Sequence, residues 1–227
     1  MKNFFITIII LYFTQLIVPS YAHVEHYKKF NSLNYELFRN DKSIGYHKYI
    51  FEREGNSLTV KSVIDFKITK LGVDLYKYFA ESAETYTDGI FNTFSSKTLQ
   101  NKKNKYVKIN SNERELTIDG SSYKGKASKN YIVGTWWNHE IVKAKAQISA
   151  ISGRIIEQNV TFIGKEDIEL YGKKYNALHF NFASSDPSLP NEKKLNTDIW
   201  YEENSFIWLK ASFNKTGRWE YRLKNNN

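Results

Sequence analysis

A long alternation of apolar and polar residues is the feature that most constrains what this chain can fold into. Between residues 58 and 69, one series is mostly apolar and the series between it is mostly polar. The two series are Leu58, Val60, Ser62, Ile64, Phe66 and Ile68, and Thr59, Lys61, Val63, Asp65, Lys67 and Thr69. Successive side chains of a strand point to opposite faces, so this pattern predicts a long, half-buried β-strand.

Turn-forming residues divide most of the remaining chain into similar strands. The turn Glu54–Ser57 joins the first strand to a partner over residues 44–54, and Asp88–Gly89 joins strands over 75–86 and 90–96. The second half repeats this spacing, with strands expected over 155–163, 167–171, 174–183, 196–202, 206–213 and 218–223. Only residues 135–149 predict a helix, because Ile141, Val142 and Lys145 fall at helical spacing among good helix formers.

About a dozen strands at hairpin spacing are typical of an all-β, mainly antiparallel fold. A sheet with so many strands must curl or close to protect its edges. We therefore expect a curved meander sheet, or a half-open or closed β-barrel, with one short helix that Thr135 could cap. An outer-membrane barrel is the main rival. Its outward faces would carry lysines and glutamates, which are unfavourable against lipid.

The N-terminus has the features of a secretory signal peptide. Lys2 precedes an apolar run over residues 4–18, and small residues Ser20 and Ala22 stand at the −3 and −1 positions of a cleavage site. The alternative is an uncleaved anchor helix, against which Pro19 and the cleavage site argue. We expect residues 1–22 to be removed, leaving a single antiparallel β domain over 23–227 in the periplasm, with no integral membrane span.

Composition excludes several classes of protein. The chain has no cysteine, which excludes disulfide scaffolds, zinc–thiolate sites, iron–sulfur clusters and cysteine-linked lipid anchors. Aromatic residues make up 16% of the chain, far too many for a disordered protein. The formal net charge of +9 comes from lysine much more than arginine, and export makes nucleic acid an unlikely partner. The densest basic cluster, Lys97, Lys102, Lys103, Lys105 and Lys108, is either a solvated loop or a surface weakly attracted to anionic lipid head groups.

No motif of a known catalytic mechanism is present in the sequence. The chain has neither a Gly-x-Ser-x-Gly nucleophile turn nor a glycine-rich phosphate loop. Candidate carboxylates for acid–base chemistry are Glu81, Glu84, Asp88, Glu166, Asp167 and Glu169, but nothing in the sequence pairs them. We therefore expect a protein that is not an enzyme and needs no cofactor.

Histidines suggest one metal site. After cleavage, the amino group and imidazole of His23 would together suit Cu(II), with His26 close behind. A further ligand would have to come from His47, His139 or His179. The simpler reading is a loose chain end that binds no metal. His179, between Leu178 and Phe180, is expected to be an ordinary strand histidine.

The aromatic pair Trp136–Trp137 suggests a binding site. Consecutive residues of a helix point in different directions, so both indoles cannot easily pack at one core position. One reading has one of them close the open end of the curved sheet, as a core residue. The other has the pair line the mouth of an apolar cavity with Tyr76 and Tyr78.

Two stretches carry a resemblance to a known group of proteins. The first is the opening hairpin from Ile44–His47 to Phe66, followed by Tyr76–Tyr78, Glu84 and Asp88–Gly89. The second runs from Thr197–Tyr201 to Phe213 and is followed by Gly217–Tyr221. Together they resemble exported bacterial β-proteins catalogued only as domains of unknown function. The implied architecture is similar to the half-barrel carriers that shelter lipoprotein acyl chains in the periplasm. Because fold does not determine function, this resemblance assigns no catalytic residue.

The sequence thus favours a monomeric, non-catalytic periplasmic protein that binds or shelters an apolar or amphipathic, lipid-like ligand. One alternative is a structural or interaction module of the cell envelope with a filled core. The third is a protein with a copper site at its mature N-terminus. An internal cavity would distinguish the first from the second.

Overall fold

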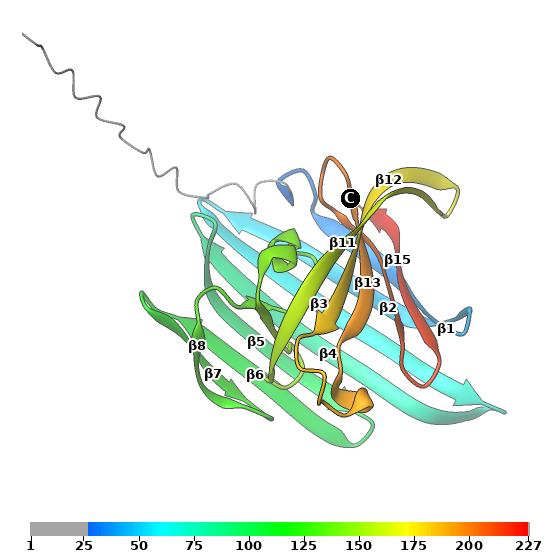
Figure 1. The fold of residues 1–227 in the computed structure, drawn as a ribbon, viewed down its shortest axis with the longest axis horizontal. Coiled ribbons are helices and arrows are strands. Elements are labelled where there is room, and N and C mark those ends of the chain that lie inside the picture. The colour runs from blue at the N-terminus through cyan, green and yellow to red at the C-terminus, as the bar shows by residue number, and fades with distance from the viewer. Residues whose placement is uncertain (1–26, 227) are drawn as a thin grey trace, which may run out of the picture.

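The computed structural model describes residues 27–226, which are almost entirely β-structure (Figure 1). The predicted signal peptide, His23 and His26 lie outside these residues. The strands are Ser32–Arg39 (β1), Lys42–Glu54 (β2), Ser57–Lys70 (β3), Val73–Thr87 (β4), Ile90–Gln100 (β5), Lys103–Ser111 (β6), Glu115–Gly120 (β7), Lys124–Ser128 (β8), Ile132–Val133 (β9), Ala146–Ile148 (β10), Ile155–Leu170 (β11), Lys173–Ser184 (β12), Asn196–Glu202 (β13), Trp208–Asn214 (β14) and Arg218–Asn226 (β15). Two short 3₁₀ helices, His139–Lys143 (η2) and Asn191–Lys193 (η3), accompany them.

All fifteen strands belong to one curved sheet. Its order is β8-β7-β6-β5-β4-β3-β2-β1-β15-β14-β13-β12-β11-β10-β9. The first strand pairs with the last. The sheet therefore consists of two halves, β1–β8 and β9–β15, which join where β1 lies beside β15. Every neighbouring pair is antiparallel except β9 and β10, which are parallel. Because β8 and β9 stand at the two ends of this order, the sheet is open, which confirms the all-β expectation and decides against the closed barrel.

Irregular pairing gives the sheet its curvature. The register between β1 and β2 shifts after Leu37, next to its partner Gly45. A Cβ atom at Gly45 would lie 2.1 Å from the Asp65 carbonyl oxygen on β3, so only glycine permits this approach of the two strands. The register between β11 and β12 also shifts, between Phe162 and Gly164. Bulges of this kind bend a strand and increase its twist, which lets the sheet curl around its apolar face.

The concave face of the sheet holds the apolar core. The alternation in β3 places Leu58, Val60 and Phe66 on that face, as the sequence predicts. The largest cluster of buried residues joins β1–β4 to β13–β15 and includes Tyr35, Tyr49 and Trp208. Two smaller clusters lie beneath β5–β8 and around Phe66, Tyr78 and Ala80. The core therefore consists of separate aromatic-rich parts along one curved surface.

The predicted helix over residues 135–149 is wrong over most of its length. Helical geometry is confined to the single turn η2, and residues 146–148 form β10 between β9 and β11. The predicted cap Thr135 is also wrong, because the side chain of Asn138 accepts the Glu140 N–H at 3.1 Å. The alanines that favour helix are buried at alternate positions, Ala144 and Ala146, followed by Ile148. Tertiary packing on the sheet thus overrides local helix propensity.

The predicted break between strands 155–163 and 167–171 is also wrong. These residues form one 16-residue strand, β11, which pairs with β12 from Gln158 to Leu170. The bulge at Phe162–Gly164 interrupts the pairing only locally, and Gln158 and Leu170 are buried on either side of it. In the sequence, Gly164 followed by the charged residues 165–167 resembles a turn between two strands.

Candidate ligand cavity

A cavity of about 520 Å³ lies within the curve of the sheet. One wall is formed by the inner faces of β2–β5, and the opposite wall by residues 134–136, 147–156, 191–197 and 213–215 with Tyr221. A volume of this size lies within the range of about 300–1,000 Å³ that is usual for small-molecule sites.

Small side chains on three neighbouring strands create this space. Ser62 on β3 pairs with Ser82 on β4, and Ser82 pairs in turn with Ser96 on β5. Two residue pairs further along, on the same face, Ala80 lies opposite Thr98. All five line the cavity, whereas aromatic residues occupy many inward positions elsewhere on the sheet. The serines satisfy their own hydroxyls, since Ser62 and Ser82 are 2.9 Å apart and Ser96 donates to the Ala150 carbonyl at 2.5 Å.

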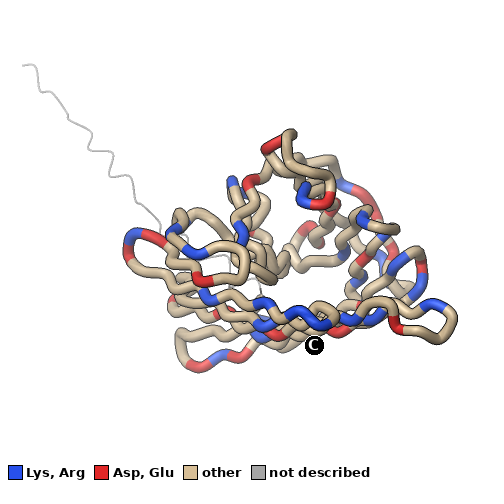
Figure 2. The backbone as a smooth tube through the Cα atoms, turned by 90° about the horizontal axis from the view of Figure 1, so that it is seen from below, with Lys and Arg blue, Asp and Glu red and all other residues tan. Residues whose placement is uncertain are grey.

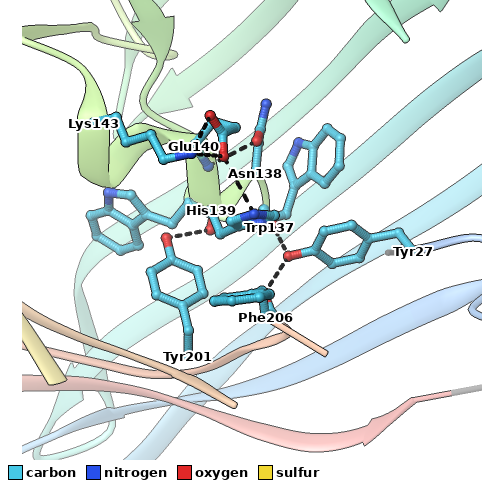
Figure 3. A network of polar contacts seen from close by, with 9 residues as sticks. Tyr27, Trp137, Asn138, His139, Glu140, Lys143, Tyr201 and Phe206 are labelled. Atoms are coloured by element: carbon cyan, nitrogen blue, oxygen red, sulfur yellow. Dashed lines mark hydrogen bonds and ion pairs between the residues drawn. The ribbon is translucent and has the colours of Figure 1, made fainter. Parts of the chain in front are cut away.

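The inner end of the cavity is closed by the segment Thr135–Trp137, which buried tyrosines hold by its backbone. Tyr49 donates to the carbonyl oxygen of Thr135. Tyr201 donates to that of Trp136 at 2.9 Å, and the Tyr27 hydroxyl contacts that of Trp137 (Figure 3). The Tyr27 hydroxyl also lies 2.7 Å from the Phe206 carbonyl oxygen. Burial raises the pKa of all three tyrosines, which keeps the hydroxyls protonated as donors.

The backbone of this segment turns sharply at Trp136, which has a φ of 63°. A bulky residue in this left-handed region is strained and needs support from its surroundings. The tyrosine hydrogen bonds supply that support. Because of the turn, Trp136 lines the cavity against Trp208 and Tyr221, while Trp137 enters the core and is 1% exposed.

A buried carboxylic acid holds the same segment from β4. Glu84 is 3% exposed and accepts hydrogen bonds from the Trp137 indole N–H and, at 3.2 Å, from the Thr135 hydroxyl. Burial raises the pKa of Glu84 to about 7, although hydrogen bonds from Trp137, Thr135 and Tyr86 oppose this shift. This side chain therefore retains its proton to higher pH than an exposed glutamate does.

Three side chains of the cavity wall have buried polar atoms with no hydrogen-bond partner within the described chain. They are His47, at both imidazole nitrogens, Thr98, at its hydroxyl, and Trp136, at its indole N–H. Burial lowers the pKa of His47 to about 3, so its imidazole is neutral at physiological pH and offers one donor and one acceptor. Buried polar groups are normally paired, so these atoms are suited to contact polar atoms of a bound molecule.

The opposite end of the cavity is its mouth, because its exposed wall residues lie there. Lys193, Lys194 and Lys215 line this end, together with Arg154. The cavity thus changes from aromatic and uncharged at its inner end to basic at its opening. An amphipathic molecule with an anionic group would match that gradient.

The four residues predicted to bind a ligand divide into two pairs. Trp136 and Tyr78 line the cavity. Trp137 instead lies in the core, and Tyr76 packs on Phe66 at a ring-centroid distance of 5.9 Å and accepts a hydrogen bond from Gln100. Sequence reasoning missed His47 as a wall residue and missed the row of small residues. Serines at inward positions of β3, β4 and β5 are visible in the sequence. That they lie next to one another follows only from the strand register, which the sequence does not give.

The other predicted histidines and carboxylates are dispersed. His47 is on β2, His139 is in η2, and His179 is on β12, where it lies 3.0 Å from Glu166 and 3.1 Å from Asp198. Of the six candidate carboxylates, Glu84 is the one that is buried. Within residues 27–226 there is no group of three or more acidic or histidine side chains placed to hold a metal ion. No helix in the same range has the length and hydrophobicity to cross a membrane.

Comparisons with known proteins give the family and the fold. A β-barrel-like protein of the domain of unknown function DUF1849 from Brucella abortus is similar in structure, with a TM-score of 0.60 and 12% identity over 86% of this chain and 96% of that one. A DUF1329 family protein from Desulfovibrio piger matches with a TM-score of 0.27 and 9% identity, over 87% of this chain and 72% of that one. No curated protein matches the sequence. The model of the domain of unknown function DUF6134 matches residues 35–224, so the chain belongs to the DUF6134 family.

Proposed function

We propose that this protein is a non-catalytic periplasmic carrier that binds an apolar or amphipathic, lipid-like molecule in its cavity. The observation that supports this most directly is the 520 Å³ space that the row of small residues leaves inside an otherwise aromatic core. A concave space of this size, closed at one end and open at the other, is the usual form of a small-molecule site.

The chemistry of the wall suits an amphipathic occupant. Aromatic and aliphatic side chains such as Tyr78, Trp136 and Ile64 alternate with serines and threonines, and His47 and Trp136 carry unpaired polar atoms. Basic residues lie at the mouth. Such a mixed wall offers contacts both to an apolar chain and to a polar group of one molecule. The alternative, an envelope module with a filled core, is disfavoured by the same cavity.

The periplasmic location rests on the N-terminal sequence, whose basic start, apolar run and Ser20-x-Ala22 site are those of an exported protein. A soluble carrier in that compartment would shield an apolar molecule from water between membranes. The open end of the cavity would serve for loading and release.

The cavity can be tested by filling it. Ala80 lines the cavity on β4, whereas Ala83 lies on the other face of the same strand. We expect wild-type protein to enhance the fluorescence of the apolar probe N-phenyl-1-naphthylamine at saturable stoichiometry. Ala80→Phe should weaken that binding at least about tenfold, because the new ring occupies the space that the probe needs.

Ala83→Phe is the matched control and should leave probe affinity unchanged. Circular dichroism of both variants would verify that the sheet is intact. Equal probe affinity of folded Ala80→Phe and wild type would contradict the proposed site.

A further inference from the structure

The hairpin formed by β3 and β4 projects beyond the rest of the sheet (Figure 1). On one side, pairing of β2 with β3 ends at Phe66, opposite Gly45. On the other, pairing of β4 with β5 begins at Tyr78, opposite Gln100. Residues 67–70 and 73–77 therefore pair only with each other, as a two-stranded extension of the sheet.

The tip of this projecting hairpin is apolar and open to solvent. Leu71 is 94% exposed, Val73 is 61% exposed and Leu75 is 57% exposed. Hairpin tips are normally polar, and three aliphatic residues on one such tip are an unusual exposure of hydrophobic surface. The fold itself gives these side chains little contact.

Leu71 is also an unfavourable residue for its backbone position. It has a φ of 50°, in the left-handed region, where asparagine, aspartate and glycine are preferred. Other hairpin turns of the chain place Asn40, Asp88 and Asn101 at such positions. Three further turns place Tyr171, Phe206 and Thr216 there, and each of these makes a specific contact. The Tyr171 hydroxyl donates to Glu36 at 2.7 Å, the Phe206 ring stacks on His139, and the Thr216 carbonyl accepts from Arg39. Leu71 has no comparable structural role.

Lysines surround this apolar tip. Lys67, Lys70 and Lys77 lie on the projecting hairpin, where Asp74 is the one acidic residue between positions 67 and 77. Asp74 is already engaged, since it accepts from Thr69 at 2.8 Å and lies 3.0 Å from Lys77. Two further exposed lysines, Lys102 and Lys103, follow Asn101 in the β5–β6 turn.

The β5–β6 turn is fixed to the base of the hairpin. The backbone N–H of Asn101 donates to the Lys77 carbonyl at 2.8 Å, and the backbone N–H of Lys77 donates to the Asn101 side-chain oxygen at 2.8 Å. The lysines of the two hairpins therefore form one basic surface beside the apolar tip.

The projecting hairpin and the mouth of the cavity lie at the same end of the sheet. The β1–β2 turn lies beside the hairpin through the β2–β3 register, and Asn40 in that turn donates its backbone N–H to the Arg218 carbonyl at 2.8 Å. This hydrogen bond places the β14–β15 turn next to the β1–β2 turn. Lys215 of the β14–β15 turn lines the mouth of the cavity. Figure 2 shows the molecule from below Figure 1, with the backbone positions of Lys and Arg in blue and those of Asp and Glu in red.

We infer that this end of the protein docks on the surface of a bilayer containing anionic phospholipids. Leu71, Val73 and Leu75 enter the interfacial region, and the lysines of the two hairpins contact the phosphate head groups. Apolar side chains within a basic surrounding are the combination that holds a protein reversibly on such a membrane. In this orientation the cavity mouth faces the lipid. The inference rests on the hairpin alone and holds whatever the cavity contains.

The first test is flotation of the purified protein with vesicles. We expect binding to vesicles of equal parts phosphatidylglycerol and phosphatidylcholine that weakens as salt rises, and little binding to phosphatidylcholine alone. Leu71→Asn combined with Val73→Thr should lower the affinity at least about tenfold. Because asparagine suits the backbone of position 71, loss of binding by this variant cannot be attributed to misfolding.

Ile90→Thr is the matched control. Ile90 is 54% exposed and follows Gly89 in the β4–β5 hairpin at the opposite end of the sheet, as Val73 follows Gly72. This substitution should leave vesicle binding unchanged. An equal loss in the control, equal binding to both kinds of vesicle, or no binding by wild type would overturn the inference.

A second measurement uses the absence of cysteine from the chain. Leu71→Cys and Ile90→Cys each introduce a single thiol for an environment-sensitive fluorophore. On anionic vesicles the label at position 71 should shift to shorter wavelength and be quenched by spin-labelled lipid, whereas the label at position 90 should not. The same response at both positions would contradict docking through the hairpin.

Discussion

At the scale of single residues, the cavity depends on side chains that are unusual for their place. Glu84 is a buried acid beneath the segment that closes the inner end, and His47 is a buried imidazole whose nitrogens are unpaired within the described chain. Buried ionisable groups destabilise a fold unless they are neutral or paired. His47 meets this requirement by being neutral, and Glu84 meets it by its hydrogen bonds and its raised pKa.

Glu84 should make the stability of the protein depend on pH. Burial raises its pKa from 4.5 to about 7, so between these values the folded state binds more protons than the unfolded state. The stabilising contribution is complete below pH 4.5 and is lost as pH rises through 7. Glu84→Gln removes this dependence. Relative to wild type, the variant should gain about 3 kcal/mol in free energy of unfolding between pH 4.5 and pH 8.

Urea denaturation of both proteins at several pH values checks this expectation. Other titrating groups are common to the two proteins and cancel in the difference. A difference that stays constant across this pH range would show that Glu84 is not a buried, raised-pKa acid.

The orientations of the predicted aromatic site residues could be predicted only in part from the sequence. The prediction that Trp136 and Trp137 point in different directions holds, although a left-handed turn and not a helix separates them. Tyr76 and Tyr78 share one strand face and both stack on Phe66, yet only Tyr78 of the two lines the cavity. Which of two equivalent residues faces a cavity depends on the lengths and registers of neighbouring strands, and these are set by contacts distant in sequence.

At the scale of elements, the segment Thr135–Trp137 is fixed by tyrosines from three different parts of the chain. Tyr27 precedes β1, Tyr49 lies on β2 and Tyr201 lies on β13. Each places a hydroxyl at a backbone carbonyl that no regular strand pairing would satisfy. The closed inner end of the cavity is therefore a tertiary structure, and local sequence preference does not predict it. This explains why the helix expected over 135–149 is absent.

Removing one of these hydroxyls should destabilise the protein. Tyr49→Phe leaves the Thr135 carbonyl buried without its donor, which should lower the free energy of unfolding by about 1–3 kcal/mol. Tyr46, on the same strand, is 47% exposed, so Tyr46→Phe is a matched control with an expected change within about 0.5 kcal/mol. Chemical denaturation measures both. Equal effects of the two substitutions would contradict the role assigned to Tyr49.

The strands themselves are well predicted because alternation is a local property. The 58–69 pattern corresponds to β3, and the turns at Glu54–Ser57 and Asp88–Gly89 join the expected partners. Prediction fails in β11, where Gly164 and the charged residues after it resemble a turn, and in β10, whose three residues are all buried and show no alternation.

At the scale of the whole molecule, the two halves of the sheet meet at β1 and β15 and enclose a space that opens at one end. That end carries the basic mouth, and beside it the apolar tip of the β3–β4 hairpin projects. A closed inner end, an uncharged wall and a basic opening are arranged along one direction. This polarity is what a carrier needs to receive and release a ligand at a surface.

The most direct test of this account is native mass spectrometry of the protein after expression and purification from the periplasm. Before measurement, the protein is incubated with a total lipid extract of the same cells. We predict one adduct of lipid-like mass per chain in wild type and in Ala83→Phe, and its loss in Ala80→Phe. Wild-type protein that stays bare, or an adduct that survives unchanged in Ala80→Phe, would contradict a lipid-binding cavity.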